Sequence, residues 1–233
     1  LASSSGIANS GTLDISGTSA GTTAQTVSGS GNIALGSQTL TLSNAAGILS
    51  GVVGGSGGLS ITGGSETLTG ANTYTGATSV GSGATLTLSG AGSLASNAIS
   101  IASGGTFNDS NGGLSASANV TDNGTFTLGA SEAINQLDGS GAVGLGSHTL
   151  TLNQGSFGGV IGGTGGLVKA GAGTLTLRED EQGLYFENEL PGTMDGKERR
   201  WRPVSSAFAF RSRMADVGSA FVCYGGRRRI SRR

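Results

Sequence analysis

The stretch GSQTLTL at residues 36–42 recurs further along the chain as GSHTLTL at residues 146–152. In both copies threonine alternates with leucine, which is the period-2 pattern of a strand with one buried face. Leu40 and Leu42 share one face of such a strand, and Thr39 and Thr41 share the other. The pattern therefore predicts a strand with leucine in the core and threonine outside.

The same Thr-(Leu/Phe) step occurs eight times, beginning at Thr12, Thr39, Thr67, Thr85, Thr106, Thr125, Thr149 and Thr174. The interval between successive copies varies unevenly from 18 to 28 residues, close to the lower end of the range of roughly 20–50 residues that is typical of a solenoid. Glycine, at 46 of 233 residues, disfavours helical solenoids. We expect one all-β parallel β-helix from about residue 11 to 177, with eight coils and a length of roughly 35 Å. The side chains expected to point inward are Leu40, Leu42, Leu68, Leu86, Leu88, Phe126, Leu128, Leu150, Leu152, Leu175 and Leu177.

The composition changes sharply after Leu177. Residues 1–177 contain 40 glycines and seven charged side chains, whereas residues 178–233 contain 12 basic and 8 acidic residues and both prolines. Basic clusters beside Trp201 would suit nucleic acid, but the interspersed acids argue against it. We expect residues 1–177 to form the repeat domain and residues 178–233 to be an irregular or disordered tail outside the rod.

Two segments carry a family resemblance. The stretch from Gly57 to Gly76 and the stretch GGLVKAGAGTLTL at residues 165–177 resemble passenger-associated transport repeats of bacterial autotransporters. The resemblance implies a right-handed β-helix that is exported by type V secretion and carried at the cell surface or outer membrane, or secreted. The second copy runs into a charged segment at Arg178, and the C-terminal outer-membrane barrel of that family is missing from the sequence. Because the sequence begins at Leu1 without a signal peptide or an initiator methionine, we expect a fragment or a processed piece.

Sites for chemistry are scarce in the sequence. The net charge of −1 gives no reason to expect nucleic acid or anionic lipid as a partner, and no apolar stretch reaches about 18 residues. His148, the only histidine, occupies a slot before the Thr-Leu step that other copies fill with Gln38, Glu66, Ala84 and glycine, which suggests a solvated position. The six acids of the repeat region suggest scattered surface charges, with Asp109 and Asp122 as candidates for a carboxylate pair. We therefore expect no catalytic residue, no metal site and no cofactor.

Six strand copies read Thr-x-Thr and would form a flat threonine ladder if their coils stacked in register. Such an array is similar to the surface of β-helical ice-binding proteins, although the uneven spacings indicate loops that would interrupt it. The ladder residues are Thr39, Thr41, Thr67, Thr69, Thr85, Thr87, Thr125, Thr127, Thr149, Thr151, Thr174 and Thr176.

The functional expectation is a non-enzymatic surface rod for adhesion, aggregation or display. Its expected partner is a host surface, an abiotic surface or a second copy of the chain, because outward rows of Thr and Ser with few charges suit self-association. The alternatives are a surface polysaccharide-active β-helix enzyme and an ice-binding Thr-x-Thr β-helix. A cluster of acids in one groove would favour the enzyme.

Overall fold

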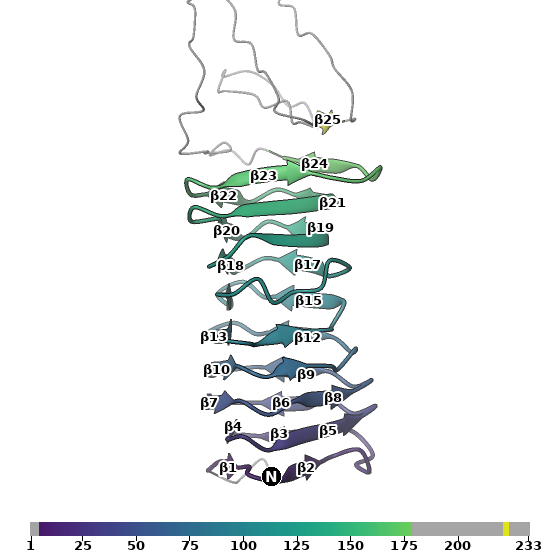
Figure 1. Ribbon diagram of the computed structural model, residues 1–233, viewed down its shortest axis with the longest axis vertical. Helices are drawn as coiled ribbons and strands as arrows, with labels where there is room; N and C mark the ends of the chain where they lie inside the picture. Colours follow the sequence, from purple (N-terminus) through teal and green to yellow (C-terminus); the bar gives the residue numbers. More distant parts are fainter. Residues whose placement is uncertain (1–4, 179–220, 224–233) are drawn as a thin grey trace, which may run out of the picture.

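The computed structural model describes residues 5–178 and 221–223 of the chain. Their turns stack into a rod that begins with β1 and β2 and ends with β23 and β24 (Figure 1). The strands of successive turns pair in parallel, and the described residues include no helix. The prediction of an all-β parallel β-helix is confirmed. No described segment is a helix with the length and apolarity needed to cross a bilayer.

One side of the rod is a long parallel sheet that contributes one strand to each of about nine turns. Each strand pairs with the strand one turn further along the chain, as in Val120↔Leu137 and Thr78↔Ile99. The rod therefore has one turn more than expected, because turns without a Thr-Leu step also add a strand here. The strands of the long sheet are β3 (Thr22–Ala24), β6 (Leu40–Leu42), β9 (Leu59–Ile61), β12 (Thr78–Val80), β15 (Ala98–Ile101), β17 (Asn119–Asp122), the C-terminal halves of β19 (Glu132–Gly139) and β21 (Thr149–Phe157), and β24 (Leu175–Leu177).

The second side is a seven-stranded parallel sheet, seen as a column of strand labels in Figure 1. Below it the pair β1 (Ile7–Ala8) and β4 (Val27–Ser28) continues the same side, through a bridge between Gly29 and Leu49. The seven strands are β7 (Ala45–Leu49), β10 (Gly64–Leu68), β13 (Ala84–Leu88), β16 (Thr106–Asp109), β18 (Thr125–Leu128), β20 (Ala142–Gly144) and β22 (Val160–Gly162).

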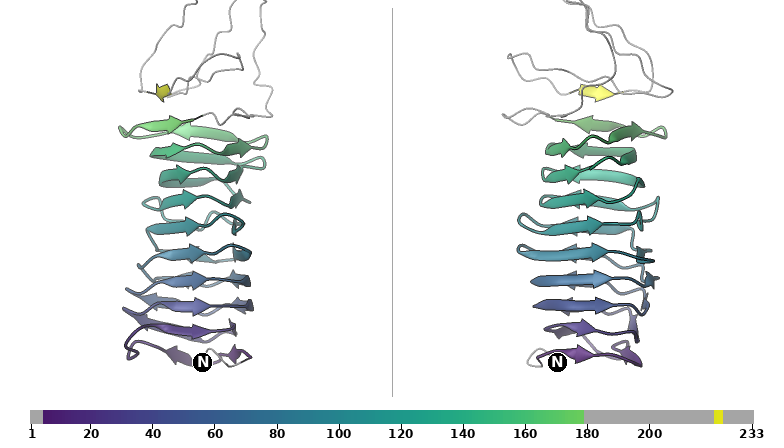
Figure 2. Two further views of the ribbon diagram at one scale, coloured as in Figure 1. Left: turned by 180° about the vertical axis from the view of Figure 1, so that it is seen from behind. Right: turned by 60° about the vertical axis from the view of Figure 1, so that its left-hand side comes forward.

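The third side is less regular. It consists of a three-stranded sheet, β2 (Thr12–Asp14), β5 (Asn32–Gly36) and β8 (Val53–Gly55), followed by the pair β11 (Ala71–Asn72) and β14 (Ser93–Leu94). Toward the C-terminal end the N-terminal halves of β19 and β21 form this side and pair onward to β23 (Gly166–Lys169). The other two views show the same stack of turns from behind and from the side (Figure 2).

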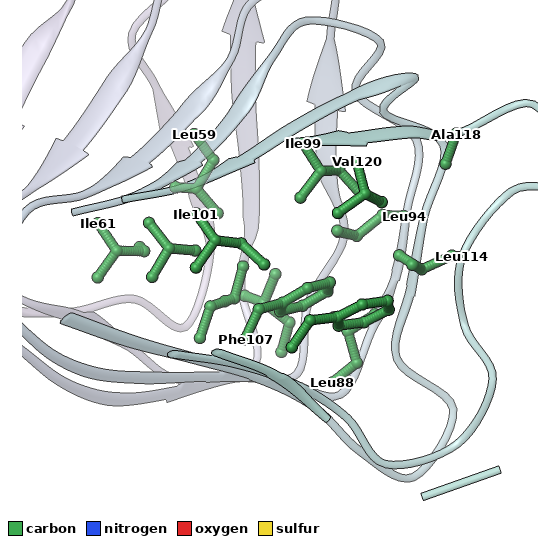
Figure 3. Close-up of a cluster of buried hydrophobic side chains, with 14 of the residues drawn as sticks. Leu59, Ile61, Leu88, Leu94, Ile99, Ile101, Phe107, Leu114, Ala118 and Val120 are labelled. Atoms are coloured by element: carbon green, nitrogen blue, oxygen red, sulfur yellow. The ribbon is translucent and has the colours of Figure 1, made fainter. Parts of the chain in front are cut away.

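The core lies between the three sides. Leu59, Ile61, Ile99 and Ile101 from the long sheet face Leu88 and Phe107 from the seven-stranded sheet, with Leu94 and Leu114 closing the third side (Figure 3). The Phe107 and Phe126 rings stack with centroids 5.6 Å apart. All the leucines and the phenylalanine that were predicted to point inward are buried, except Leu177, which is partly buried against the core. Thr39 is exposed and Thr149 is half-buried, as expected for the outer face.

The long sequence repeat is also a repeat of corner geometry. Gly36 and Gly146 both have positive φ, 59° and 55°, and each accepts backbone hydrogen bonds through its carbonyl oxygen from the two residues that begin the corner of the next turn. In those corners a Cβ on Gly57 or Gly165 would lie 1.8 Å from a backbone oxygen of the turn below, so only glycine fits. Both copies thus need glycine at the same steps for the same steric reason.

The two copies nevertheless lie on different sides of the rod. The interval between them is not a whole number of turns: the second copy falls one side short of returning to the long sheet, whose strand in that turn begins only after Leu152. Leu40–Leu42 is a strand of the long sheet, whereas Leu150 and Leu152 pair with Leu167 and Lys169 on the third side. The sequence repeat is therefore out of phase with the turns.

The predicted tail, residues 178–233, lies outside the described residues except for Arg178 and β25 (Phe221–Cys223). β25 pairs antiparallel with β24 at the last turn. The proposed boundary after Leu177 stays a prediction.

Candidate functional site

The twelve threonines of the predicted ladder are distributed over all three sides. The long sheet holds Thr41 and Thr176, with Thr39 and Thr174 directly before their strands, and the third side holds Thr149 and Thr151. The seven-stranded sheet holds Thr67, Thr85, Thr87, Thr125 and Thr127, with Thr69 directly after β10. Where two successive Thr-(Leu/Phe) steps are separated by a shorter interval, the interval is one turn, and both steps lie in the same sheet. Where the interval is longer, it exceeds one turn, and the second step lies on another side of the rod. The structure therefore brings together the threonines of residues 67–127 and separates the others from them.

A different hydroxyl row runs the full length of the long sheet. Direct register partners connect one outward residue of each strand to the next, and the Ser79 hydroxyl donates to the Ser60 hydroxyl at 3.1 Å. We call this row the hydroxyl ladder; its residues are Thr23, Thr41, Ser60, Ser79, Ser100, Thr121, Asp138, Ser156 and Thr176. Only Asp138 carries a charge. Serines occupy half of the hydroxyl positions, so a search for Thr-x-Thr alone missed the row.

Asp109 and Glu132 form a carboxyl pair at the corner between the seven-stranded sheet and the third side. Asp109 Oδ1 accepts hydrogen bonds from the backbone N–H groups of Gly112 (3.1 Å) and Gly113 (3.0 Å). Glu132, one turn further on, accepts from Leu114 N–H through Oε2 at 3.1 Å and from Ala133 N–H through Oε1 at 2.8 Å. Both side chains are buried, at 0% and 7% exposure. The pair therefore holds the loop of residues 110–114 in place.

Glu132 is the member of this pair whose pKa is raised. Burial, together with the hydrogen bond and the charge of Asp109, raises the pKa of Glu132 to about 7. Asp109 Oδ2 has no other hydrogen-bond partner in the described structure, so a protonated Glu132 supplies the donor that it lacks. Sequence reasoning missed Glu132 because it lies a full turn and its corners beyond Asp109 in the chain.

Asp122, the other candidate acid, lies elsewhere. It ends β17 at the corner between the long sheet and the seven-stranded sheet, where its Oδ1 accepts from Gly124 N–H at 2.9 Å. It is fully buried, and burial raises its pKa to about 6. The suggested pairing of Asp109 with Asp122 is therefore wrong, because the two strands end at different corners of the rod.

Glu66 shows why the acids are not scattered surface charges. It lies on β10 in the same inward column as Leu86 and Phe107, and it is 0% exposed. Neither carboxyl oxygen of Glu66 has a hydrogen-bond partner. Burial raises the pKa of Glu66 to about 8, and the nearby Gly47 backbone, which lowers it, has the smaller effect. Four of the six acids of residues 1–177 are buried, namely Glu66, Asp109, Asp122 and Glu132, so that expectation was wrong.

The slot before the Thr-Leu step was also misinterpreted as solvated. In a strand the residue before threonine lies on the same face as the following leucine, so Glu66 and Ala84 point into the core. His148 is half-buried because it precedes β21, in a corner where its N–H donates to the Leu145 carbonyl at 2.9 Å. The side chain directly before the Thr-Leu step therefore points into the core where it lies in a strand, and it is partly exposed only where it lies in a corner.

A shallow depression of about 520 Å³ lies on the three-stranded sheet near the N-terminal end. It is lined by small, uncharged residues: Thr12, Ser16, Asn32, Ile33, Ala34, Gly36, Val52, Gly54 and Gly55. None of the buried acids lines it. Among the described residues, no three His, Cys, Asp or Glu side chains gather as metal ligands would.

The fold and these surfaces define a class, a parallel β-solenoid whose sides carry rows of hydroxyl groups. No protein-family model, curated protein or solved structure matches this chain.

Proposed function

We propose that this chain is a non-enzymatic rod of the autotransporter passenger type, carried on a bacterial cell surface, where it serves adhesion, aggregation or display. The observation that carries the proposal is the hydroxyl ladder, which presents a row of short polar groups over about nine turns. Hydroxyl groups both donate and accept hydrogen bonds, so such a row suits uncharged polar surfaces and a second copy of the rod. The resemblance of residues 57–76 and 165–177 to passenger-associated transport repeats supports export.

The stacked construction also suits export. Each turn contacts mainly its neighbours, so a solenoid folds turn by turn as it emerges from a narrow channel. The core that forms as the turns stack consists mainly of aliphatic and aromatic side chains.

The buried acids support a non-catalytic role. A glycosidase uses two carboxyl groups that both reach the substrate. Asp109 and Glu132 are instead buried and bonded to the backbone of their own corner. Their role here is to accept hydrogen bonds from backbone N–H groups of the corner and so to hold the corner in place.

The test is surface display of the full chain fused to an autotransporter barrel in a bacterial host. We expect protease-accessible rods and faster settling of the cells, and we expect the double variant Ser79→Lys/Thr121→Lys to settle like cells without the fusion, because like charges then repel. The matched control Thr85→Lys/Thr125→Lys places the same charges on the other sheet and should settle like the wild type. Equal settling of all fusions and of cells without one would contradict the proposal.

A further inference from the structure

The outer face of the seven-stranded sheet is regular and free of charge. Each strand places two outward residues in register with those of its neighbours, from Ala46 and Ile48 on β7 to Val160 and Gly162 on β22. No register shift interrupts these pairings, and none of the outward residues is charged. We call its four central strands the threonine face, with the residues Ser65, Thr67, Thr85, Thr87, Thr106, Asn108, Thr125 and Thr127.

The spacing of the threonine face is fixed by the backbone. Neighbouring strands lie ~4.8 Å apart, and alternate residues along a strand lie ~6.6 Å apart, so the eight side chains form a two-by-four lattice. The uneven intervals between the Thr-x-Thr copies were expected to interrupt such a lattice. They do not interrupt it on these four strands, because the differences in length between turns lie in the corner loops and the strands stay in register.

The side chains of the threonine face are also restricted in their motion. Asn108 donates to the Thr87 hydroxyl at 3.3 Å and accepts from the Thr127 hydroxyl at 2.6 Å, which connects three turns. Threonine has a stiff χ1, and the stacked Phe107 and Phe126 rings lie directly behind this part of the sheet. Ordering these groups on binding a rigid surface therefore costs little conformational entropy.

We propose that the threonine face binds the surface of ice crystals. Both of its repeat distances are of the order of the oxygen repeats in hexagonal ice, and each threonine offers a hydroxyl group to hydrogen-bond to lattice water and a methyl group around which water is already ordered. Charged groups keep a hydration shell that ice does not incorporate, and this face has none. The contribution of each residue is small, and the eight add up because they bind one rigid lattice.

The experiment uses the full chain and pure water ice. We expect the wild type to shape growing ice crystals and to open a measurable gap between the melting and freezing points. Thr87→Lys should abolish both effects, since it places a charge at the centre of the lattice. Thr151→Lys, at an equally half-buried outward threonine on the third side, is the matched control and should keep them.

Circular dichroism and thermal melting should show that both variants keep the wild-type fold. A wild type without crystal shaping at millimolar concentration overturns the proposal, as does an unchanged freezing gap in folded Thr87→Lys. If instead the wild type dimerises through this face, with Thr87→Lys monomeric and no freezing gap in either, the partner is a second copy and ice binding is wrong. None of these results depends on the settling assay, so failure here leaves the surface-rod function standing.

Discussion

The carboxyl group of Glu66 lies against Gly47 on the adjoining strand, where a Cβ on Gly47 would be 3.2 Å from each carboxyl oxygen. The same Cβ would lie 2.4 Å from the Val27 backbone oxygen. The missing side chain of Gly47 thus gives room to an acid in a column that is otherwise apolar further up the rod, through Leu86, Phe107 and Phe126. A buried acid without a hydrogen-bond partner is stable only in its neutral form.

The stability of the rod should therefore fall as the pH rises. The pKa of Glu66 is about 8 in the folded chain and near 4.5 when unfolded, so the folded state binds more protons between these values. The free energy of unfolding then decreases by up to about 1.4 kcal/mol per pH unit in this window, and it is highest below pH 4.5 as far as Glu66 is concerned. Urea unfolding of the wild type and Glu66→Gln from pH 5 to 9 measures this. Glu66→Gln should flatten the slope, and an equally steep slope in that variant would assign it to other groups.

The Asp109–Glu132 pair gives a second pH-dependent prediction. Above pH 7 Glu132 ionises beside Asp109, and the two like charges destabilise their corner. Asp109→Asn keeps an oxygen for the Gly112 and Gly113 N–H groups and adds a donor toward Glu132, so at pH 8 it should raise the melting temperature by ~2–4 °C, or about 1 kcal/mol. At pH 5 the difference should shrink. Asp109→Ala is the counterpart that leaves both N–H groups unpaired, and it should cost ~1–3 kcal/mol at either pH. An Asn variant less stable than the wild type at pH 8 would contradict the repulsion between an ionised Glu132 and Asp109.

The core positions were predictable from sequence because each depends on strict alternation within one strand. Leu40, Leu86 and Leu150 follow from that pattern alone. Which side of the rod a strand occupies depends instead on the number of residues in every preceding corner, so Thr41 and Thr151 could not be told apart by their identical neighbours. The inward direction of Glu66 was available from the same alternation, but its charge suggested solvent. The partnership of Asp109 with Glu132 joins two turns, and no local pattern encodes it.

A charge in the core should disrupt the rod where the same charge outside does not. Leu150 is fully buried on β21, and its neighbour Thr151 is half-buried on the outer face. Leu150→Asp should destabilise the surrounding turns by several kcal/mol, because it buries a charge beside Glu132, its register partner. Thr151→Asp should change the melting temperature by a few degrees at most. Limited proteolysis followed by mass spectrometry locates the opened turns, and similar protection in both variants would mean that the inward assignment of Leu150 is wrong.

His148 should be dispensable for surface behaviour. Its structural contribution is made by its backbone, through the N–H bond to Leu145 and the carbonyl that accepts from Gly166 N–H at 3.1 Å. His148→Ala keeps both groups, so cell settling and surface attachment should equal those of the wild-type fusion. A large loss of either in a folded His148→Ala variant would identify a functional position that we have missed.

The segment after Leu177 should contribute little to the stability of the rod. The Thr-Leu alternation stops there, and the glycine-rich composition of the rod ends with it. In the described structure the only strand of this segment is β25, which pairs with β24 at the last turn. Because a solenoid is stabilised mainly by contacts between neighbouring turns, a contact at one end adds to the last turn alone. Cutting the chain after Leu177 should therefore lower the melting temperature by only a few degrees relative to the full chain. A decrease of ~10 °C or more corresponds to several kcal/mol in a domain of this size, and it would show that the segment is an integral cap of the rod.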